Sequence, residues 1–464
     1  MKEKTIGLKK KIMIGVSIFL VFAILIAILI LFAPLPMDVE WDSIYDIHSN
    51  VVKLEVGEKN NKTGSVALVK YSGEDADGNP IVDTSDWKVL QFTDMHLSET
   101  NDGDLGNNRT IREYIAAIER EKPDFVVLTG DVITSIRGRA RAVQLCEIME
   151  RLGVYWAYVL GNHEGDEFFK MTREELMGIV EKYPHCVSDT TVKKTEDGTK
   201  VWGIGNFVVN LLGENHKIVQ SMIFMDSGNE ISESDYNRLK GSTPGLESDS
   251  YDFLKESQKT WFKEQVENVS LISEGAAKSM LFIHIPLFQQ RKLKYVSYSD
   301  LPEGWTKEVA GEGWEYVPGT IAHDHNGNPV GQDAIATDWK VVAGTANFEG
   351  VCSSDYDNDM YPLIYDTTLN GKVNALFCGH DHTNDSIVYQ QKEGKEPVYL
   401  AYGLCSGYAT YNLYKQKKTD DPKNLKKGYS VIEIHQNSTF DFSGVSYDYD
   451  YKTTKYIENS VAVG

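Results

Sequence analysis

The chain has 464 residues, 41% of them hydrophobic and 25% charged, which excludes wholesale disorder and leaves room for more than one domain. Forty-seven basic residues against 68 acidic ones give a net charge of −21, so we expect no nucleic-acid binding through a basic surface. The five cysteines are too few and too scattered for a disulfide framework or a zinc knuckle.

The N-terminal segment has the pattern of a signal anchor. Residues 1–11 contain five lysines and one glutamate, and the 22 residues of 12–33 carry no charge. A helix of that length is about 33 Å long, enough to cross a bilayer core of about 30 Å. Because flanking lysines stay in the cytoplasm, we expect a single-pass protein of the cell membrane with everything after residue 33 outside. A cleaved signal peptide is the alternative, although the apolar run is long and Pro34-Leu35-Pro36 stands where cleavage would occur.

After the apolar segment, residues 38–85 are predicted to form an acidic, extracellular lead-in with short β-type runs at 51–56 and 65–69. From Trp87 a different pattern begins, in which short apolar runs alternate with helical spacing. We predict strands at 87–93, 125–129 and 154–160, separated by helices at about 108–121 and 140–152. This order predicts an α/β layered domain with parallel strand pairing over residues 86–464.

Later in the chain we predict strands at 219–225, 279–283, 373–377 and 398–402, and a helix at about 252–268 with one apolar face. The stretch of about 289–349 is rich in glycine and aromatic residues and has weak periodicity. We interpret it as a long insertion over one face of the domain, because long loops of this kind often serve as functional lids.

Five of the predicted strands run into polar residues of one chemical kind. These are Asp94-Met95-His96, Gly130-Asp131, Gly161-Asn162-His163-Glu164, His284, and Gly379-His380-Asp381-His382. Ligands of open α/β sheets gather at the carboxyl ends of the strands, so residues almost 290 positions apart are expected to converge on one site. Imidazole, carboxylate and amide oxygen are the ligands that borderline divalent metals prefer.

Each of these motifs is weak by itself, since Asp-x-His and Gly-Asp are common in surface loops. All five in this order, each after a predicted strand, form a specific pattern. In this order the residues resemble the calcineurin-like metallophosphoesterase superfamily over residues 87–410. The stretches 224–228, 284–286, 377–385, 402–403 and 406–407 are similar to the branch related to purple acid phosphatases, which includes plant purple acid phosphatase 29-like proteins and the yeast dosage-dependent cell-cycle regulator phosphatase.

The resemblance implies a four-layer αββα sandwich of two mixed sheets, here preceded by one transmembrane helix, and a centre of two divalent metal ions. Asp94, His96 and His382 would hold one metal, and Asn162, His284 and His380 would hold the second. Asp131 would bridge the two metals. His163 would bind no metal and would face the substrate, stabilising charge or protonating the leaving oxygen.

The chain departs from the purple acid phosphatases at two positions. Their iron-binding tyrosine, three residues after the bridging aspartate, corresponds to Thr134, and their Asp-x-Gly corresponds to Asp94-Met95-His96. We therefore expect a colourless, histidine-rich centre with Mn, Fe(II) or Zn. Asp381 and Glu164 are predicted either to orient an imidazole or to be solvated carboxylates.

The function implied is hydrolysis of phosphate esters by a metal-activated hydroxide, performed by a phosphatase or phosphodiesterase anchored in the membrane and facing outward. The alternative is a catalytically weak or inactive cell-surface binding protein that keeps the fold. Net charge does not select a substrate, because a cleft that holds two cations reverses the local potential. The sequence leaves open monoester or diester specificity, the metal and the oligomeric state.

Overall fold

The structure is a computed structural model that describes residues 2–32, 35, 50–98, 103–164, 171–324, 326–346, 349–411, 427–447 and 456–461. Residue 33 of the predicted span, residues 38–49 of the lead-in, and residues 325 and 347–348 of the insertion lie outside the described residues. So do residues 99–102, 165–170, 412–426, 448–455 and 462–464 of the predicted domain.

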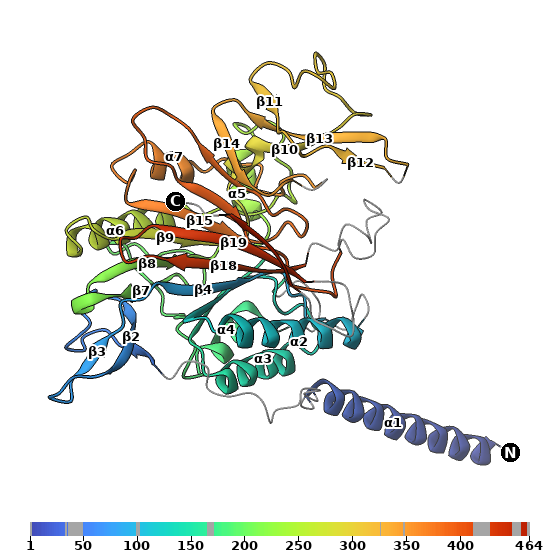
Figure 1. Cartoon of the computed structure of the whole chain (residues 1–464). Helices are drawn as coiled ribbons and strands as arrows, with labels where there is room; N and C mark the ends of the chain where they lie inside the picture. The colour runs from blue at the N-terminus through green and yellow to red at the C-terminus, as the bar shows by residue number, and fades with distance from the viewer. Residues whose placement is uncertain are drawn as a thin grey trace.

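A six-stranded mixed sheet contains the strands predicted after Trp87. Its order is β20-β19-β18-β4-β5-β6, with β4, β5 and β6 parallel to one another and β18 antiparallel to β4. Helices α2, α3 and α4 lie along one face of it (Figure 1). The bounds are β4 (Trp87–Phe92), β5 (Phe125–Thr129), β6 (Trp156–Val159), β18 (Gly428–Ile434), β19 (Phe440–Tyr447), β20 (Tyr456–Val461), α2 (Gly103–Glu121), α3 (Gly138–Leu152) and α4 (Arg173–Val180).

A ten-stranded mixed sheet lies beside it, in the order β1-β2-β7-β8-β9-β15-β17-β16-β14, with β3 paired to β2. Within it, β8, β9, β15 and β17 are parallel. The bounds are β1 (Val51–Leu54), β2 (Val66–Glu74), β3 (Pro80–Val82), β7 (Phe207–Leu212), β8 (Ile218–Phe224), β9 (Lys278–Phe282), β14 (Trp339–Ala343), β15 (Val373–Cys378), β16 (Ile387–Gln390) and β17 (Tyr399–Tyr402). The helical elements near it are α5 (Glu233–Leu239), α6 (Glu256–Ile272), α7 (Met360–Tyr365), η2 (Glu214–His216) and η3 (Phe288–Lys292).

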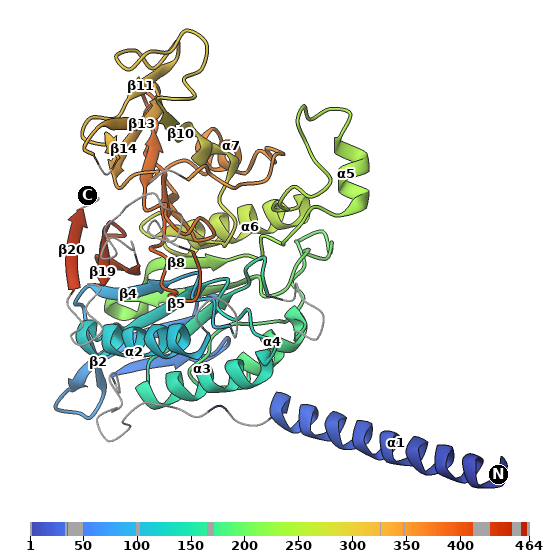
Figure 2. The same ribbon diagram turned by 90° about the vertical axis from the view of Figure 1, so that its right-hand side faces the viewer.

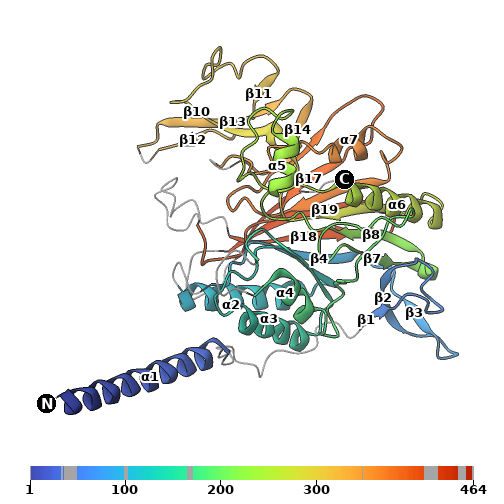
Figure 3. The same cartoon turned by 180° about the vertical axis from the view of Figure 1, so that it is seen from behind.

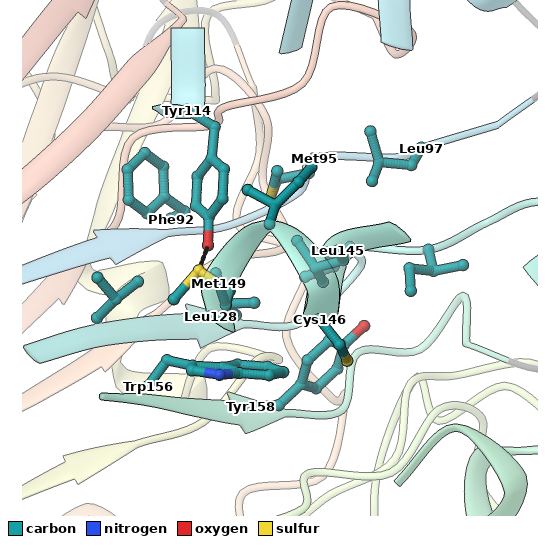
Figure 4. Packing of buried hydrophobic residues seen from close by; sticks show 14 of the residues in the cluster. Phe92, Met95, Leu97, Tyr114, Leu128, Leu145, Cys146, Met149, Trp156 and Tyr158 are labelled. Carbon is teal, nitrogen blue, oxygen red and sulfur yellow. Dashed lines mark hydrogen bonds between the residues drawn. The ribbon is translucent and has the colours of Figure 1, made fainter. Parts of the chain in front are cut away.

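Three apolar cores hold these layers together. The core between the sheets includes a run of aromatic rings in which Phe282 stacks between Phe224 and Phe377. A second core joins the six-stranded sheet to its helices, where the Tyr114 hydroxyl donates to the Met149 sulfur (Figure 4). The third core joins the ten-stranded sheet to α6 and α7. The layers therefore run helix, sheet, sheet, helix, which confirms the predicted four-layer sandwich.

The predicted insertion contains a sheet of its own. Four antiparallel strands, β10 (Leu293–Ser297), β11 (Trp314–Tyr316), β12 (Ala322–His323) and β13 (Pro329–Ala336), form it. The next strand, β14, pairs with β16 at the edge of the ten-stranded sheet. Figure 2 shows the small sheet extending from one end of the layered domain.

The segments before residue 87 differ in their relation to this domain. Helix α1 (Lys2–Phe32) extends away from the layers in Figure 3, and its side chains 10–28 are all exposed. Its stretch Lys10–Ile28 is long and apolar enough to cross a membrane. Strand β2 of the lead-in pairs in parallel with β7, so β1 and β2 extend the ten-stranded sheet, and the boundary drawn after residue 85 separates strands that share a sheet.

Candidate metal centre

The predicted site residues follow the ends of five strands from both sheets. Asp94 and His96 come after β4, Asp131 after β5, and Asn162 and His163 after β6, all in the six-stranded sheet. His284 follows β9, and His380 and His382 follow β15, in the ten-stranded sheet. The structure brings all eight side chains to one region, where the carboxyl ends of the two parallel strand groups meet.

Two groups of potential ligand atoms form there. In the first, which we call the first site, His382 Nε2 lies 3.1 Å from His96 Nε2 and 3.4 Å from Asp94 Oδ1. In the second site, His284 Nε2 lies 3.0 Å from Asn162 Oδ1 and 3.3 Å from His380 Nδ1.

Asp131 belongs to both groups. Its Oδ2 lies 3.5 Å from His96 Nε2 and 3.2 Å from His284 Nε2. Its other oxygen, Oδ1, accepts the main-chain N–H of His163 at 2.8 Å, which fixes the orientation of the carboxylate. One oxygen of Asp131 is therefore held by the backbone while the other points between the two sites.

The backbone at the site is strained, and glycines make the close approaches. Among the ten non-glycine residues of positive φ in the described chain, four are Asp94, His96, Asp131 and His380. Such backbone conformations cost free energy and occur mostly where function requires them. At Gly161, a Cβ would lie 2.2 Å from Asp131 Oδ1, so only glycine fits there.

The electrostatics of the site favour positive charge. Burial would raise the pKa of Asp131, but the charge of the His284 imidazole holds it well below its usual range. Burial would lower the pKa of His284, but Asp131 raises it to about 10. Burial lowers the pKa of His382 to about 4 and that of His380 to about 3. Asp131, His380 and His382 therefore have the protonation states that metal binding requires, an ionised carboxylate and neutral imidazoles, whereas His284 has to release its proton when a metal binds.

The residues fit a pair of divalent metal ions. Asp94 Oδ1 and Asp131 Oδ2 are buried side-chain oxygens without a hydrogen-bond partner, although buried carboxylates normally have one. The second oxygen of Asp94 accepts from Thr93 Oγ1 at 2.8 Å and from the His380 N–H at 2.9 Å. Each carboxylate thus keeps one oxygen available, and the available oxygen faces imidazole nitrogens, which is the donor set of Mn, Fe and Zn.

His163 lies beside the first site. Its ring centroid is 5.4 Å from that of His96 at an angle of 61°, and the residue is partly exposed. On the second site, Tyr251 meets the ring of His380 edge to face, with centroids 4.4 Å apart. No sequence pattern singles out Tyr251, because the residue belongs to no metal-binding motif.

Glu164 has neither of the two roles predicted for it. Its buried carboxylate accepts main-chain N–H groups of Gly161 at 2.6 Å, Val132 at 2.7 Å and Asp131 at 3.1 Å, and the Tyr158 hydroxyl at 2.8 Å. It therefore joins the loop after β5 to the loop after β6. A buried acceptor for so many donors is a structural anchor of the site, and the prediction of a solvated or imidazole-orienting carboxylate is wrong.

Asp381 is also buried, and its contacts likewise differ from the prediction. Its carboxylate accepts the Tyr402 hydroxyl at 2.6 Å, the main-chain N–H of Cys352 at 3.2 Å and the Asn384 amide at 3.2 Å. Asp381 thereby fixes the loop that contains His380 and His382 to β17 and to Cys352, just after the insertion.

Comparison with known families agrees with this geometry. Residues 88–327 match the family described as calcineurin-like phosphoesterase. The chain belongs to the calcineurin-like phosphoesterase family. This membership confirms the predicted resemblance and supports the predicted enzyme class, a hydrolase of phosphoric ester bonds.

Relatives within this family come from the predicted branch. The chain is 28% identical to "Probable inactive purple acid phosphatase 29" of Arabidopsis thaliana, over 70% of this chain and 73% of that protein. It is 27% identical to "Probable inactive purple acid phosphatase 28" of the same plant, over 76% and 78% of the two chains. It is also 27% identical to "Phosphatase DCR2" of Saccharomyces cerevisiae, over 69% of this chain and 48% of that protein.

Solved structures show weaker similarity. A dimetal phosphatase from Danio rerio aligns with a TM-score of 0.43 and 11% identity, covering 82% of this chain and all of that one. The purple acid phosphatase PPD1 from yellow lupin seeds aligns with a TM-score of 0.35 and 11% identity, covering 85% and 58% of the two chains.

Proposed function

We propose that the chain is a metal-dependent phosphoesterase with a dinuclear centre, anchored in the cell membrane by α1 and facing outward. The observation that supports it most is the position of Asp131 Oδ2, which is buried, has no hydrogen-bond partner and lies between the imidazoles of His96 and His284. A carboxylate in that position suits a bridge between two cations. We assign Asp94, His96 and His382 to the first metal and Asn162, His284 and His380 to the second.

Two divalent cations in these sites supply Lewis-acid chemistry, which acidifies water and neutralises charge on phosphoryl oxygens. The protein's residues hold the cations and position the side chain that faces the substrate. The two sheets fix the ligands from opposite sides, and the backbone bond from His163 to Asp131 holds the His163 imidazole beside the first site. From there His163 donates a proton to the leaving oxygen or stabilises the phosphoryl charge, a contribution typically of about 100- to 10,000-fold in rate.

A test of this proposal separates turnover from metal binding. We would compare the full chain in detergent micelles, loaded with Mn, Fe(II) or Zn, with His163→Asn and with His435→Asn. The control residue His435 pairs with Asp86 and lies outside the site. We expect His163→Asn to lose at least about 100-fold in kcat while it retains two metals, and His435→Asn to match the wild type. A preference for p-nitrophenyl phosphate over its bis-ester would indicate a phosphatase, and the reverse a phosphodiesterase.

A second candidate function is a cell-surface binding protein without turnover. The names of the two Arabidopsis relatives, which call them probably inactive, favour it. The complete set of candidate ligands in this chain argues against it. Equal and negligible turnover by the wild type and by His163→Asn, both with full metal content, would support this second function and contradict the first.

The membrane part of the proposal depends on α1. Its stretch Lys10–Ile28 is apolar, its described side chains contact no core, and lysines precede it in the sequence. We propose that it remains as a single-pass anchor with residues 1–11 in the cytoplasm, ahead of the span 12–33, the lead-in 38–85 and the catalytic domain 86–464 with its insertion at about 289–349.

A further inference from the structure

The first-site imidazole of His382 is held by two consecutive side chains, Thr410 and Tyr411. With Nε2 facing the site, the Nδ1–H of His382 donates to Thr410 Oγ1 at 2.7 Å. The Tyr411 ring stacks on the imidazole with centroids 4.1 Å apart and planes 19° from parallel. Bonds of this kind fix the tautomer and the orientation of a metal-ligating histidine.

The equivalent support in the second site is of a different kind. There, His284 Nδ1–H donates to the main-chain carbonyl of Thr129 at 2.7 Å. Thr129 is the last residue of β5, a strand with all five residues buried. The imidazole of His284 is thus oriented by the rigid backbone of a central strand. The imidazole of His382 depends instead on side chains of residues 403–411, a segment that follows β17 and lies outside the named helices and strands.

This segment is fastened at the backbone by a buried lysine. The Lys427 ammonium, 1% exposed, donates to the carbonyl of Tyr411 at 2.9 Å and to Cys405 Sγ at 2.8 Å. Earlier in the segment, the Gly407 N–H donates to the carbonyl of Asp94 at 3.1 Å. The segment therefore follows the first-site loop closely before it reaches His382.

Glu349, at the end of the insertion, completes the arrangement. Its carboxylate accepts the Tyr411 hydroxyl at 2.5 Å with one oxygen. With the other it accepts the main-chain N–H of Thr383 at 2.8 Å and the Thr383 hydroxyl at 2.7 Å. Because Thr383 directly follows His382, Glu349 links the insertion both to Tyr411 and to the loop that contains His382.

We propose that Thr410 and Tyr411 are positioning residues of the first metal site and that Glu349 makes its occupancy depend on the insertion. The inference rests on the proposed function, and it adds an asymmetry between the two metals. Changes at these three residues weaken metal binding at the first site and leave metal binding at the second site, whose His284 is oriented by the backbone of β5, unchanged.

Titration of the metal-depleted full chain with Mn²⁺ in detergent micelles tests this. Isothermal titration gives affinity and stoichiometry, and electron paramagnetic resonance separates a coupled pair of Mn²⁺ ions from a single ion. We expect Thr410→Val to lower the affinity of one site about 10- to 100-fold, with a single-ion spectrum at limiting Mn²⁺, and Thr410→Ser to restore the wild-type behaviour. Tyr411→Phe keeps the stacked ring and removes the hydroxyl, which donates to Glu349 and accepts the main-chain N–H of His382 at 3.5 Å, so a smaller loss is expected.

Two controls remove the same groups elsewhere. Thr63→Val deletes a buried hydroxyl bonded to Asn61 and Ser65 in the lead-in, and Tyr365→Phe deletes a hydroxyl bonded to the Gln390 carbonyl. Both should bind two Mn²⁺ as the wild type does.

A cycle of Tyr411→Phe, Glu349→Gln and the double variant should be non-additive, since both changes alter the same Tyr411–Glu349 hydrogen bond. Additive losses would overturn the role of Glu349. Equal Mn²⁺ binding by Thr410→Val and wild type, or equal weakening of both sites, would overturn the positioning role. A wild-type chain that binds fewer than two Mn²⁺ would instead overturn the proposed function.

Discussion

At Gly161 the loop after β6 lies close to Asp131 in the loop after β5, so substituting this glycine should damage the centre without removing a ligand. A methyl group there would lie 2.2 Å from Asp131 Oδ1 and 2.3 Å from Asp131 N. We expect Gly161→Ala to displace the bridging carboxylate and to lower Mn²⁺ affinity by at least about 10-fold, measured by titration calorimetry.

Gly178→Ala is the matched control for this substitution. It adds the same methyl group on α4, where no atom lies within 4 Å, and a helix interior favours alanine over glycine. Wild-type affinity in both variants would show that the loops adjust and that the close contact does not position Asp131.

At the same scale, the sequence locates the candidate ligands but not their supports. Few residue types bind borderline metals, so Asp94 or His284 after a buried strand is conspicuous. A threonine such as Thr410 carries no such signal. Its hydroxyl contacts His382 only in the folded chain, and no local pattern links the two residues. The same holds for Glu164, whose donors come from two different loops.

Among elements, the predictable ones are those whose burial shows in a continuous apolar run. All five residues of β5 are buried, and its sequence alone predicts a strand. The strands of the insertion give no comparable run. β13 begins at Pro329 and contains Gly331 and the buried pair Gln332-Asp333, whose side chains are satisfied by the insertion itself, as when Gln332 donates to the Val317 carbonyl. Polar residues with such partners are compatible with a strand but do not predict one.

The insertion offers a test at the element scale through two neighbouring glycines. Gly311 and Gly313 have φ of +81° and +78°, but a Cβ at Gly311 would lie 2.0 Å from Trp305 Nε1, whereas at Gly313 no atom lies within 4 Å. Both alanine variants share the backbone strain, so their difference isolates the indole contact. We expect the free energy of unfolding of the insertion to be about 1–3 kcal/mol lower in Gly311→Ala than in Gly313→Ala, which is the usual cost of overpacking.

Hydrogen exchange followed by mass spectrometry measures this difference locally. Faster exchange in β10 and β13 of Gly311→Ala than of Gly313→Ala, with unchanged exchange in β4–β6, would establish that Trp305 packing stabilises the insertion separately from the layered domain. Identical exchange in the two variants would mean that only the φ strain matters.

At the scale of the whole molecule, the candidate centre lies where two sheets meet. The first site takes Asp94 and His96 from one sheet and His382 from the other, and the second site takes Asn162 and His284 in the same way. Sequence order predicts the ligands and the layered class, but it does not show that β2 pairs with β7 about 140 residues later. Such pairings depend on packing between distant segments, which local patterns do not encode.

The orientation of the molecule in the membrane is the prediction that belongs to this scale. The lysines of residues 1–11 should hold the N-terminus in the cytoplasm, so the layered domain should lie outside. Protease added to intact cells should then digest the domain, and a variant with Lys9, Lys10 and Lys11 changed to Glu should show partly inverted, protected chains. Digestion only after the cells are broken would reverse the orientation.

The mass of the mature protein separates an anchor from a cleaved signal. An anchored chain keeps residues 1–33, sediments with membranes and needs detergent for release, since a helix as apolar as Lys10–Ile28 inserts stably. A cleaved chain would begin after the apolar run and appear in the medium or the periplasm. In that case catalysis at the proposed centre would be unaffected, but its substrates would not need to lie within reach of the membrane surface.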